Sequence, residues 1–593
     1  MKDLKSLNKY LWRYRGRLTL GFIFVALSNA FAVLQPRMIS QALDLVLQDI
    51  KSIEMAEGFE SQALISSNLS SSLLSYGLLV IGFALLMGIF MYFTRQTIIV
   101  VSRLIEYDLR KDIYDHYSKL SQNFYRKSKI GDLMNRIMED VSKVRMYLGP
   151  AILYGINLTT LTVLVVSFMV SVSSELSLYT LIPLPLLSVS IYYVSSIVHK
   201  RSTKIQQQLS LLTSLAQEVY SGIRVVKSFV KGKQMGNYFT DQCDDYKSKS
   251  MELVKVNAFF FPLMMLIIGI STIFVIYFGG LQINKGNISA GTLVEFIIYV
   301  NMLTWPVTSI GWIASIVQQA AASQRRIDEF FNQKPQILNG NITDFEFEES
   351  IEFKNVSFVY PDTGIKALEN ISFTIKKGDR IAIIGKTGSG KTTIAEIILR
   401  TFDPSEGEVL IDGKPLESLD LLHWRTLIGY VPQDNFLFSD TIENNIKFGQ
   451  NDATLDEVME AATKASIHKE IAELPSAYQT AVGERGVTLS GGQKQRTSIA
   501  RAIIKDPEII ILDDALSAVD ANTEQVVTNY LDQDLKGKTV FNITHRINPN
   551  SEYDQIIILQ KGHISAIGKH EVLYHSNSFY KHLIDHAALE NLE

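Results

Sequence analysis

Asp513 and Asp514 stand side by side at the end of an apolar run in the stretch PEIIILDDALSAVD, Pro507–Asp520. The run Ile509–Leu512 predicts a buried strand. A strand that ends in paired carboxylates is suited to hold a metal ion and a water beside a phosphate. We expect Asp513 to be the partner of a Mg²⁺ ion and Asp514 to orient or deprotonate the attacking water. The pattern favours hydrolysis of a nucleoside triphosphate.

A phosphate-binding loop of the matching kind lies earlier in the chain. The stretch GKTGSGKTT, Gly385–Thr393, follows the strand-like run Arg380–Ile384 and opens the helical run IAEIILRTF. Glycines let backbone amides turn toward a phosphate, and a helix start adds donors and the positive end of its dipole. We expect Lys391 to reach the β- and γ-phosphates and Thr392 to ligate Mg²⁺. The alternative is an ordinary glycine-rich turn, which the strand and helix context disfavours.

The first half of the chain has the composition of a membrane domain. Six apolar stretches are near the roughly 20 residues that span a bilayer. They are about residues 18–34, 73–101, 151–172, 176–198, 256–283 and 292–317. The alternative, buried helices of a large soluble domain, is disfavoured because six such runs carry few charges. Polar residues inside them, such as Asn29 and Glu295, either face a cavity or make interhelical hydrogen bonds.

Charge distribution predicts the orientation. Residues 102–145 and 199–255 are long, helical in pattern and rich in lysine and arginine, so they and both termini are expected in the cytoplasm. This predicts a multi-pass membrane protein. The formal charge of −4 over 593 residues excludes a strongly basic nucleic-acid binder, and the single cysteine, Cys243, cannot form an internal disulfide.

Residues 351–593 differ in character from those before them. Short apolar runs alternate with amphipathic helical patterns, which is typical of an α/β domain with a mainly parallel sheet. The predicted organisation is therefore a transmembrane domain at 1–325, a linker at 326–350 and a nucleotide-binding domain at 351–593. The fold class is an α-helical six-span transmembrane domain with long cytoplasmic extensions, followed by an α/β P-loop ATPase domain.

Further motifs give the chain a family resemblance. LSGGQKQR, Leu489–Arg496, is the signature of ATP-binding cassette (ABC) proteins, and VGERG, Val482–Gly486, resembles the segment that exporters place before it. NFYRKSKIGDLMNRIMEDV, Asn123–Val141, and EVYSGIRVVKSF, Glu218–Phe229, are similar to the intracellular segments of type IV exporters. The chain resembles a half-transporter of that class, close to bacterial multidrug exporters and lipid flippases.

The resemblance implies roles for particular residues. The implied ATP-binding residues are Tyr360, which stacks on adenine, and Gly385, Gly388, Gly390, Lys391, Thr392 and Thr393. The implied Mg²⁺ site is formed by Thr392, Asp513 and the Q-loop glutamine Gln433, and the implied catalytic residues are Asp514, Gln433 and the switch histidine His545. The signature residues Leu489, Ser490, Gly491, Gly492 and Gln493 would serve ATP held by a partner subunit, and Ser517 and Asp520 belong to the D-loop. Short helices near residues 115–125 and 212–220 would dock on the nucleotide domains.

Asp514 departs from the family pattern, which usually has glutamate at this position. A shorter side chain on a rigid strand end draws the carboxylate away from the water. We therefore expect the chain's own ATP site to be slow, and its intact signature to complete a competent site on a different half-transporter. The alternative is a homodimer in which Asp514 works through a shifted water.

The expected function is ATP- and Mg²⁺-dependent export or flipping of hydrophobic or amphipathic substrates. Membrane lipids and a second half-transporter are the expected partners. A rival of another class is an ATP-gated channel or a regulatory membrane subunit that senses nucleotide without pumping.

Overall fold

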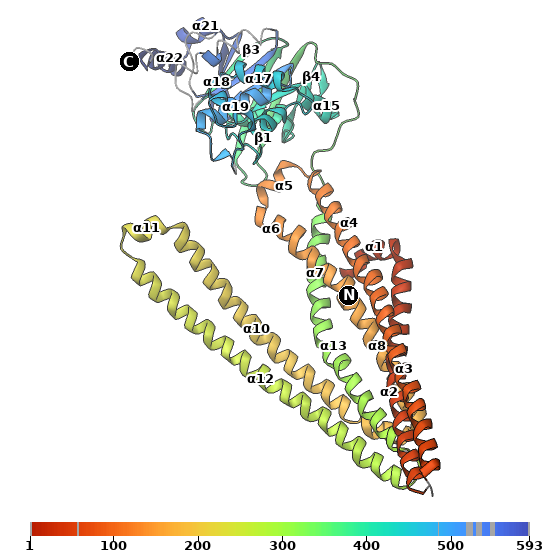
Figure 1. Ribbon diagram of the computed structural model, residues 1–593. Coiled ribbons are helices and arrows are strands. Elements are labelled where there is room, and N and C mark those ends of the chain that lie inside the picture. The colour runs from red at the N-terminus through yellow and green to blue at the C-terminus, as the bar shows by residue number, and fades with distance from the viewer. Residues whose placement is uncertain are drawn as a thin grey trace. The chain divides into compact units, whose positions relative to one another are not determined.

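The computed structural model describes residues 3–55, 59–483, 486–516, 526–528, 537–545 and 552–590 (Figure 1). The chain forms two compact units. The first unit comprises Met1–His116 and Gly131–Asn332, and the second comprises Tyr117–Ile130 and Gln333–Glu593. The second unit therefore includes a short segment that the membrane half of the sequence supplies.

The first unit is helical. Its elements are η1 (Asp3–Leu7), α1 (Asn8–Arg13), α2 (Arg15–Met55), α3 (Phe59–Thr94), η2 (Arg95–Ile99), α4 (Val100–Tyr117), α6 (Ile130–Asn135), η3 (Arg136–Asp140), α7 (Val141–Met146), η4 (Tyr147–Ala151), α8 (Ile152–Val172), α9 (Ser174–Leu181), α10 (Pro183–Ser221), α11 (Ile223–Ser228), α12 (Gly232–Asn284) and α13 (Ala290–Phe331). Helices suit a bilayer because they satisfy their backbone polar groups internally.

Five helical stretches within the described residues are long and apolar enough to cross a membrane. They are Arg15–Met55, Leu64–Tyr117, Ile130–Val172, Gly232–Asn284 and Ala290–Phe331. They contain five of the six predicted spans and run well beyond them. The remaining predicted span, 176–198, is divided between α9 and α10, which are separated at Ile182. Pro183 lies at the start of α10, as expected for a residue without a backbone donor.

The helices of the first unit meet in an apolar core. Val33 of α2, Val165 of α8, Val275 of α12 and Phe296 of α13 are fully buried in one cluster. Outside this core, α10 and α12 run side by side as a hairpin that diverges from α13 toward α11 (Figure 1). The second short cytoplasmic helix was predicted at 212–220, which is wrong. Those residues continue α10, and the break comes at Gly222, followed by α11.

Polar side chains inside the predicted spans join helices. Asn29 of α2 donates a hydrogen bond to Thr160 Oγ1 of α8 at 2.6 Å. The hydroxyl of Tyr299 in α13 donates to Glu295 and to the carbonyl of Val33 in α2, both at 3.0 Å. For Asn29 the structure therefore bears out interhelical bonding, the blander of the two alternatives, whereas Glu295 bonds to Tyr299 of its own helix and Tyr299 makes the contact with α2.

The second unit contains two sheets. Their strands are β1 (Ser350–Val359), β2 (Lys366–Lys376), β3 (Arg380–Gly385), β4 (Glu406–Ile411), β5 (Lys414–Pro415), β6 (Ile428–Val431), β7 (Ile509–Asp513), β8 (Thr539–Thr544), β9 (Gln555–Gln560) and β10 (His563–Gly568). The larger sheet has the order β10-β9-β3-β8-β7-β6 and is parallel from β9 to β6. The smaller sheet, β2-β1-β4-β5, is antiparallel. The predicted mainly parallel α/β domain is confirmed.

Helices flank the sheets. The α-helices of this unit include α5 (Gln122–Lys127), α14 (Lys391–Ile398), α15 (Leu421–Thr426), α16 (Ile442–Lys447), α17 (Leu455–Lys464), α18 (His468–Ala472), α19 (Gly491–Ile503), α21 (His570–Ser576) and α22 (Ser578–Glu590). Because β3 and β7 are buried on both faces, they read as continuous apolar runs in the sequence.

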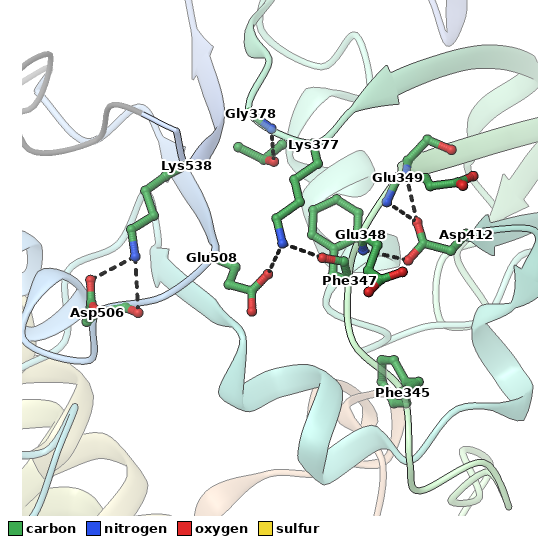
Figure 2. A network of polar contacts seen from close by, with 12 residues as sticks. Phe345, Phe347, Glu348, Glu349, Lys377, Gly378, Asp412, Asp506, Glu508 and Lys538 are labelled. Atoms are coloured by element: carbon green, nitrogen blue, oxygen red, sulfur yellow. Dashed lines mark hydrogen bonds and ion pairs between the residues drawn. The ribbon is translucent and has the colours of Figure 1, made fainter.

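Figure 2 shows how the chain is attached where it enters β1. The carboxylate of Asp412 accepts backbone N–H bonds from Glu348, Glu349 and Ser350 at 2.7–2.8 Å. Lys377 donates to the carbonyl of Phe347 and to Glu508, which precedes β7. These bonds tie the start of the small sheet to the large sheet, next to the strands that carry the candidate site.

Candidate ATP-binding and hydrolysis site

The loop between β3 and α14 can adopt its backbone path only because its key positions are glycines. Gly388 and Gly390 have φ of +79° and +100°, a region that L side chains rarely adopt. A Cβ on Gly390 would lie 2.4 Å from the carbonyl oxygen of Ala367. A Cβ on Gly385 would lie 2.4 Å from the carbonyl oxygen of Leu559 and 2.5 Å from Ser389 Oγ. Glycine is therefore required by conformation or by space at each of these positions.

Lys391 lies at the first position of α14, directly after this loop. Its ammonium group donates to the carbonyls of Gly385 and Lys386, at 2.8 and 3.1 Å. Burial lowers the pKa of Lys391, and the carboxylates of Asp514 and Asp513 oppose that shift. The cation is thus folded back over the loop, where it fits the negative charge of a nucleotide phosphate.

Asp513 and Thr392 provide oxygen ligands of the kind that Mg²⁺ prefers. Thr392 Oγ1 donates to Asp513 Oδ1 at 3.3 Å, and Asp513 is only 2% exposed. Burial raises the pKa of Asp513 to about 6, although the Thr392 hydrogen bond opposes this. The buried Oδ2 of Asp513 has no hydrogen-bond partner in the described part of the chain. An unsatisfied carboxylate oxygen beside a threonine hydroxyl fits a divalent cation.

Asp514 lies within hydrogen-bond distance of the other two predicted catalytic side chains, Gln433 and His545. His545 Nδ1 lies 2.8 Å from Asp514 Oδ1 and 3.0 Å from Oδ2. Gln433 Nε2, from the segment after β6, donates to Asp514 Oδ2 at 3.4 Å. The structure thus brings Gln433, Asp514 and His545 together.

The backbone of Asp514 is held in an unusual conformation. Its φ is +53°, and its N–H donates to the carbonyl of Ile543 at 2.7 Å. Its own carbonyl oxygen is 3.4 Å from the side-chain amide of Gln495 in α19. Because both backbone groups are held, the main chain has little freedom to bring the short carboxylate forward.

Tyr360, at the end of β1, is anchored to the phosphate-binding helix. Its hydroxyl donates to Glu396 Oε2 at 2.7 Å and lies 2.9 Å from Thr393 Oγ1, both in α14. Burial raises the pKa of Tyr360 to about 12, and burial also raises the pKa of Glu396. The guanidinium carbon of Arg126, in α5, lies 4.3 Å from the centre of the Tyr360 ring.

The signature residues begin a helix. Ser490 is the N-cap of α19 and forms a capping box with Gln493. Gln493 also donates to Glu470, and Arg496 pairs with the same carboxylate at 2.6 Å. Gly491 and Gly492 lie in the first turn, where backbone N–H groups have no carbonyl partner within the helix and are suited to an anion. Leu489 packs against the apolar cluster around α16, α17 and α19. Ser517 and Asp520 lie outside the described residues.

Three residues at this site were not predicted from the sequence, namely Arg126, Asp362 and Glu396. Glu396 is three residues after Thr393, so a shared helix face was the available signal. Arg126 pairs with Asp362 at 3.0 Å across 236 residues of sequence, and no local pattern indicates that contact.

Comparisons with known proteins agree with this arrangement. Residues 18–307 match the family model of the ABC transporter transmembrane region, and residues 368–517 match that of the ABC transporter. The probable multidrug resistance ABC transporter ATP-binding/permease protein YheI of Bacillus subtilis (strain 168) is 34% identical over 98% of this chain and 96% of its own length. The multidrug resistance-like ATP-binding protein MdlA of Escherichia coli (strain K12) is 35% identical over 84% and 85%.

Two further comparisons concern a lipid flippase and a solved exporter structure. The ATP-dependent lipid A-core flippase of Syntrophus aciditrophicus (strain SB) is 33% identical over 81% of this chain and 80% of its own length. A solved structure of a bacterial Atm1-family ABC exporter with ATP bound matches with a TM-score of 0.77 and 24% identity, over 97% of this chain and 98% of that chain. At this identity the last comparison shows the fold alone. The chain belongs to the ABC transporter family, as an exporter-type half-transporter that joins a membrane domain to an ATP-hydrolysing domain.

Proposed function

We propose that this chain is one half of a dimeric, ATP-driven exporter of hydrophobic or amphipathic compounds, and that its own ATP site hydrolyses slowly. Both termini and the nucleotide domain lie on the cytoplasmic side of a bacterial inner membrane. A second half-transporter with glutamate at the matching position completes the assembly. The observation that carries the slow site is the fixed backbone of Asp514, together with its short carboxylate.

The residues of the site have separable tasks. The loop Gly385–Gly390 and Lys391 bind the phosphates, and Tyr360 stacks on the base. Thr392, Asp513 and Gln433 would hold Mg²⁺, which neutralises phosphate charge when bound. His545 is within hydrogen-bond distance of both oxygens of Asp514 and so fixes the orientation of that carboxylate. Asp514 would have to reach the attacking water from this fixed position.

A dimer is supported by the surface of the α10–α12 hairpin. Tyr220, Phe229 and Val230, around α11, are 74%, 71% and 87% exposed. Apolar side chains gathered at a hairpin end indicate a protein contact. A second half-transporter would cover them, and its ATP would contact Ser490 and Gly492 of this chain.

The cargo class is supported by a cavity of the membrane domain and by the relatives. A cavity of about 670 Å³ lies between α10 and α13. His199, Gln206 and Gln318 line it beside Ile191 and Ile310, so it offers polar groups next to apolar walls. Such a surface suits amphipathic molecules. Two of the relatives are named for multidrug resistance and one for lipid A-core flipping.

A partner-dependence experiment tests the proposal. The tagged chain is purified from its native membranes, and co-purifying half-transporters are identified by mass spectrometry. We expect a second half-transporter, slow ATP turnover by this chain alone, and fast turnover by the pair. Rapid turnover by the chain alone that Asp514→Asn abolishes would instead establish the homodimer with a working Asp514.

Transport is measured separately in inside-out vesicles that contain the assembled pair. ATP-dependent uptake of a fluorescent amphipathic drug, or ATP-dependent movement of a labelled lipid between leaflets, supports export. The matched control carries Lys391→Ala in both subunits. Cargo movement that persists in this control would refute an ATP-driven exporter.

A further inference from the structure

A cluster of three arginines and one glutamate joins α4 to α7 in the first unit. Glu106 of α4 is only 8% exposed, and both of its carboxylate oxygens are paired. Oε1 pairs with Arg110 at 2.9 Å, and Oε2 pairs with Arg103 at 3.0 Å. The Nε atom of Arg145, in α7, lies 3.5 Å from Oε2. Three guanidinium groups therefore converge on one carboxylate, and these four residues are called the arginine cluster below.

The close approach of α4 and η4 brings Glu106 and Arg145 together. A Cβ on Gly149 of η4 would lie 2.6 Å from Ser102 Oγ of α4, so this approach requires a glycine or a shift of Ser102. Glu106 lies four residues after Ser102, and Arg145 lies four residues before Gly149. Four residues are about one helical turn, so the next contact along these antiparallel helices is that of Glu106 with Arg145. Helix packing thus buries the carboxylate beside Arg145.

The other two arginines carry the positive charge of the cluster to its surface. Arg103 and Arg110 stand three residues before and four residues after Glu106, so all three share one face of α4. The side chains of Arg103 and Arg110 are 61% and 42% exposed, whereas that of Arg145 is 16% exposed. In the described part of the chain, none of the three arginines has an ion pair with an acid other than Glu106. The cluster therefore has two positive charges in excess, and because like charges repel at short distance, an anion on its exposed side would relieve this repulsion.

The exposed face of α4 has the residue types of a membrane surface. Tyr107 lies between the two exposed arginines along that face and is 66% exposed. Tyrosine is enriched where a membrane meets water, and arginine is enriched at the cytoplasmic ends of spans. Arg103 is two residues beyond the predicted span 73–101, and Arg145 is six residues before the predicted span 151–172. At 1.5 Å per residue these offsets are about 3 Å and about 9 Å, so the cluster lies close to the head-group layer of a bilayer.

We propose that Arg103 and Arg110 bind a phosphate group supplied by the head group of an anionic membrane lipid, and that Glu106 positions both arginines. A guanidinium group has five N–H donors, so pairing with Glu106 leaves donors for a second anion. The excess charge favours a head group whose phosphate is not neutralised by an amine, and most of all a head group with two phosphates. That the lipid belongs to the cytoplasmic leaflet rests on the proposed orientation, whereas the site itself does not.

Lipid binding by the purified full-length chain in detergent, without nucleotide, tests this assignment. Native mass spectrometry during titration with cardiolipin, phosphatidylglycerol or phosphatidylcholine gives an apparent dissociation constant for the first bound lipid. We expect cardiolipin to bind most tightly and phosphatidylcholine most weakly. The double variant Arg103→Ala/Arg110→Ala should weaken the first cardiolipin about 25-fold, since one arginine near a membrane surface contributes about fivefold. This variant leaves Arg145 to pair with Glu106, so the contact between the helices is kept.

Further variants separate binding from folding. Arg103→Lys should lose only part of the affinity for cardiolipin, because it keeps the charge but loses the planar set of donors. Arg325→Ala removes an exposed arginine of the same unit, the partner of Glu329 at 3.2 Å, and should leave the affinity unchanged. The double variant should melt at the same temperature as the wild-type chain when lipid is absent. Equal affinities for cardiolipin and phosphatidylcholine, or an unchanged affinity for cardiolipin in the double variant, overturn the proposal.

A second arm of the experiment distinguishes a lipid from a soluble source of phosphate. Inorganic phosphate at millimolar concentration should leave the first cardiolipin bound. If it displaces cardiolipin from the wild-type chain but binds the Arg103→Ala/Arg110→Ala variant poorly, the site belongs to a soluble phosphate and the lipid assignment is wrong. Because no nucleotide is present, a failed lipid site leaves the proposed ATP-driven exporter standing, and a failed transport assay leaves the lipid site standing.

Discussion

The substitution Asp514→Glu restores the methylene that the family pattern leads us to expect, and it should activate the chain's own site. The backbone cannot compensate for the short side chain, because the N–H of Asp514 is bonded to Ile543 and its carbonyl to Gln495. A methylene moves the carboxylate by about 1 Å, and a misplacement of that size costs about 100-fold in rate. We therefore expect about a 100-fold increase in turnover, or about 2.7 kcal/mol in activation free energy.

The assay is steady-state ATP hydrolysis by the purified chain in lipid nanodiscs at saturating Mg-ATP. Because the signature of this chain is intact, two copies of the variant can supply complete sites to each other. The matched control is Asp514→Glu combined with Lys391→Ala, which should remove the gain. Asp514→Asn should not lower the slow wild-type rate by more than a few-fold.

Two outcomes would refute this reasoning. A wild-type rate that already equals that of Asp514→Glu would mean that Asp514 reaches the water as it stands. A rate unchanged by Asp514→Glu and strongly reduced by Asp514→Asn would mean the same. In either case the contact with His545 would be part of a working site.

The described contacts lead to three further predictions. Lys391→Ala should reduce the affinity of this chain for ATP at least about tenfold in probe displacement, because it removes the cation that lies over the loop; unchanged affinity would contradict this. Ser490→Ala removes the N-cap of α19, and in the assembled transporter it should slow hydrolysis at the partner's site while leaving ATP binding at this chain's own loop intact. Burial raises the pKa of Asp112, but hydrogen bonds from Tyr10 and Lys9 outweigh it, so the pKa is lowered from its ordinary 3.8. Asp112 should therefore fully stabilise the attachment of residues 3–14 to α4 above pH 3.8, and this stabilisation should be lost only as the pH falls through the lower folded pKa. Hydrogen exchange of residues 3–14, compared with the Asp112→Asn variant, measures this pH dependence.

Much of the nucleotide domain was predictable because its signals are local. The strand, glycine loop and helix from Arg380 to Ile398 are contiguous in the sequence. The positive φ angles of Gly388 and Gly390 explain why glycine occupies these positions. The apolar run before Asp513 is likewise a direct consequence of a strand buried on both faces. The apolar stretches of the membrane half, and the scarcity of glycine and proline between them, predicted helices. A separate short helix was wrongly predicted at 212–220, because α10 continues through these residues to Ser221 and the break comes at Gly222.

The remaining features depend on contacts that have no local signature. Arg126 meets Asp362 only after the chain has folded, and neither residue type nor spacing distinguishes Arg126 from the neighbouring Lys127. The partner of a side chain, and not its own identity, decides its role in such a cluster.

The position of α5 gives the two units a specific mechanical link. The second unit is joined to the first by three connections along the chain, at residues 116–117, 130–131 and 332–333. Two of these connections flank α5, which is held to the nucleotide domain by Arg126 on Asp362 and by Asn123 on Gln336. A rearrangement of the second unit therefore acts on the ends of α4, α6 and α13 at once, through covalent bonds.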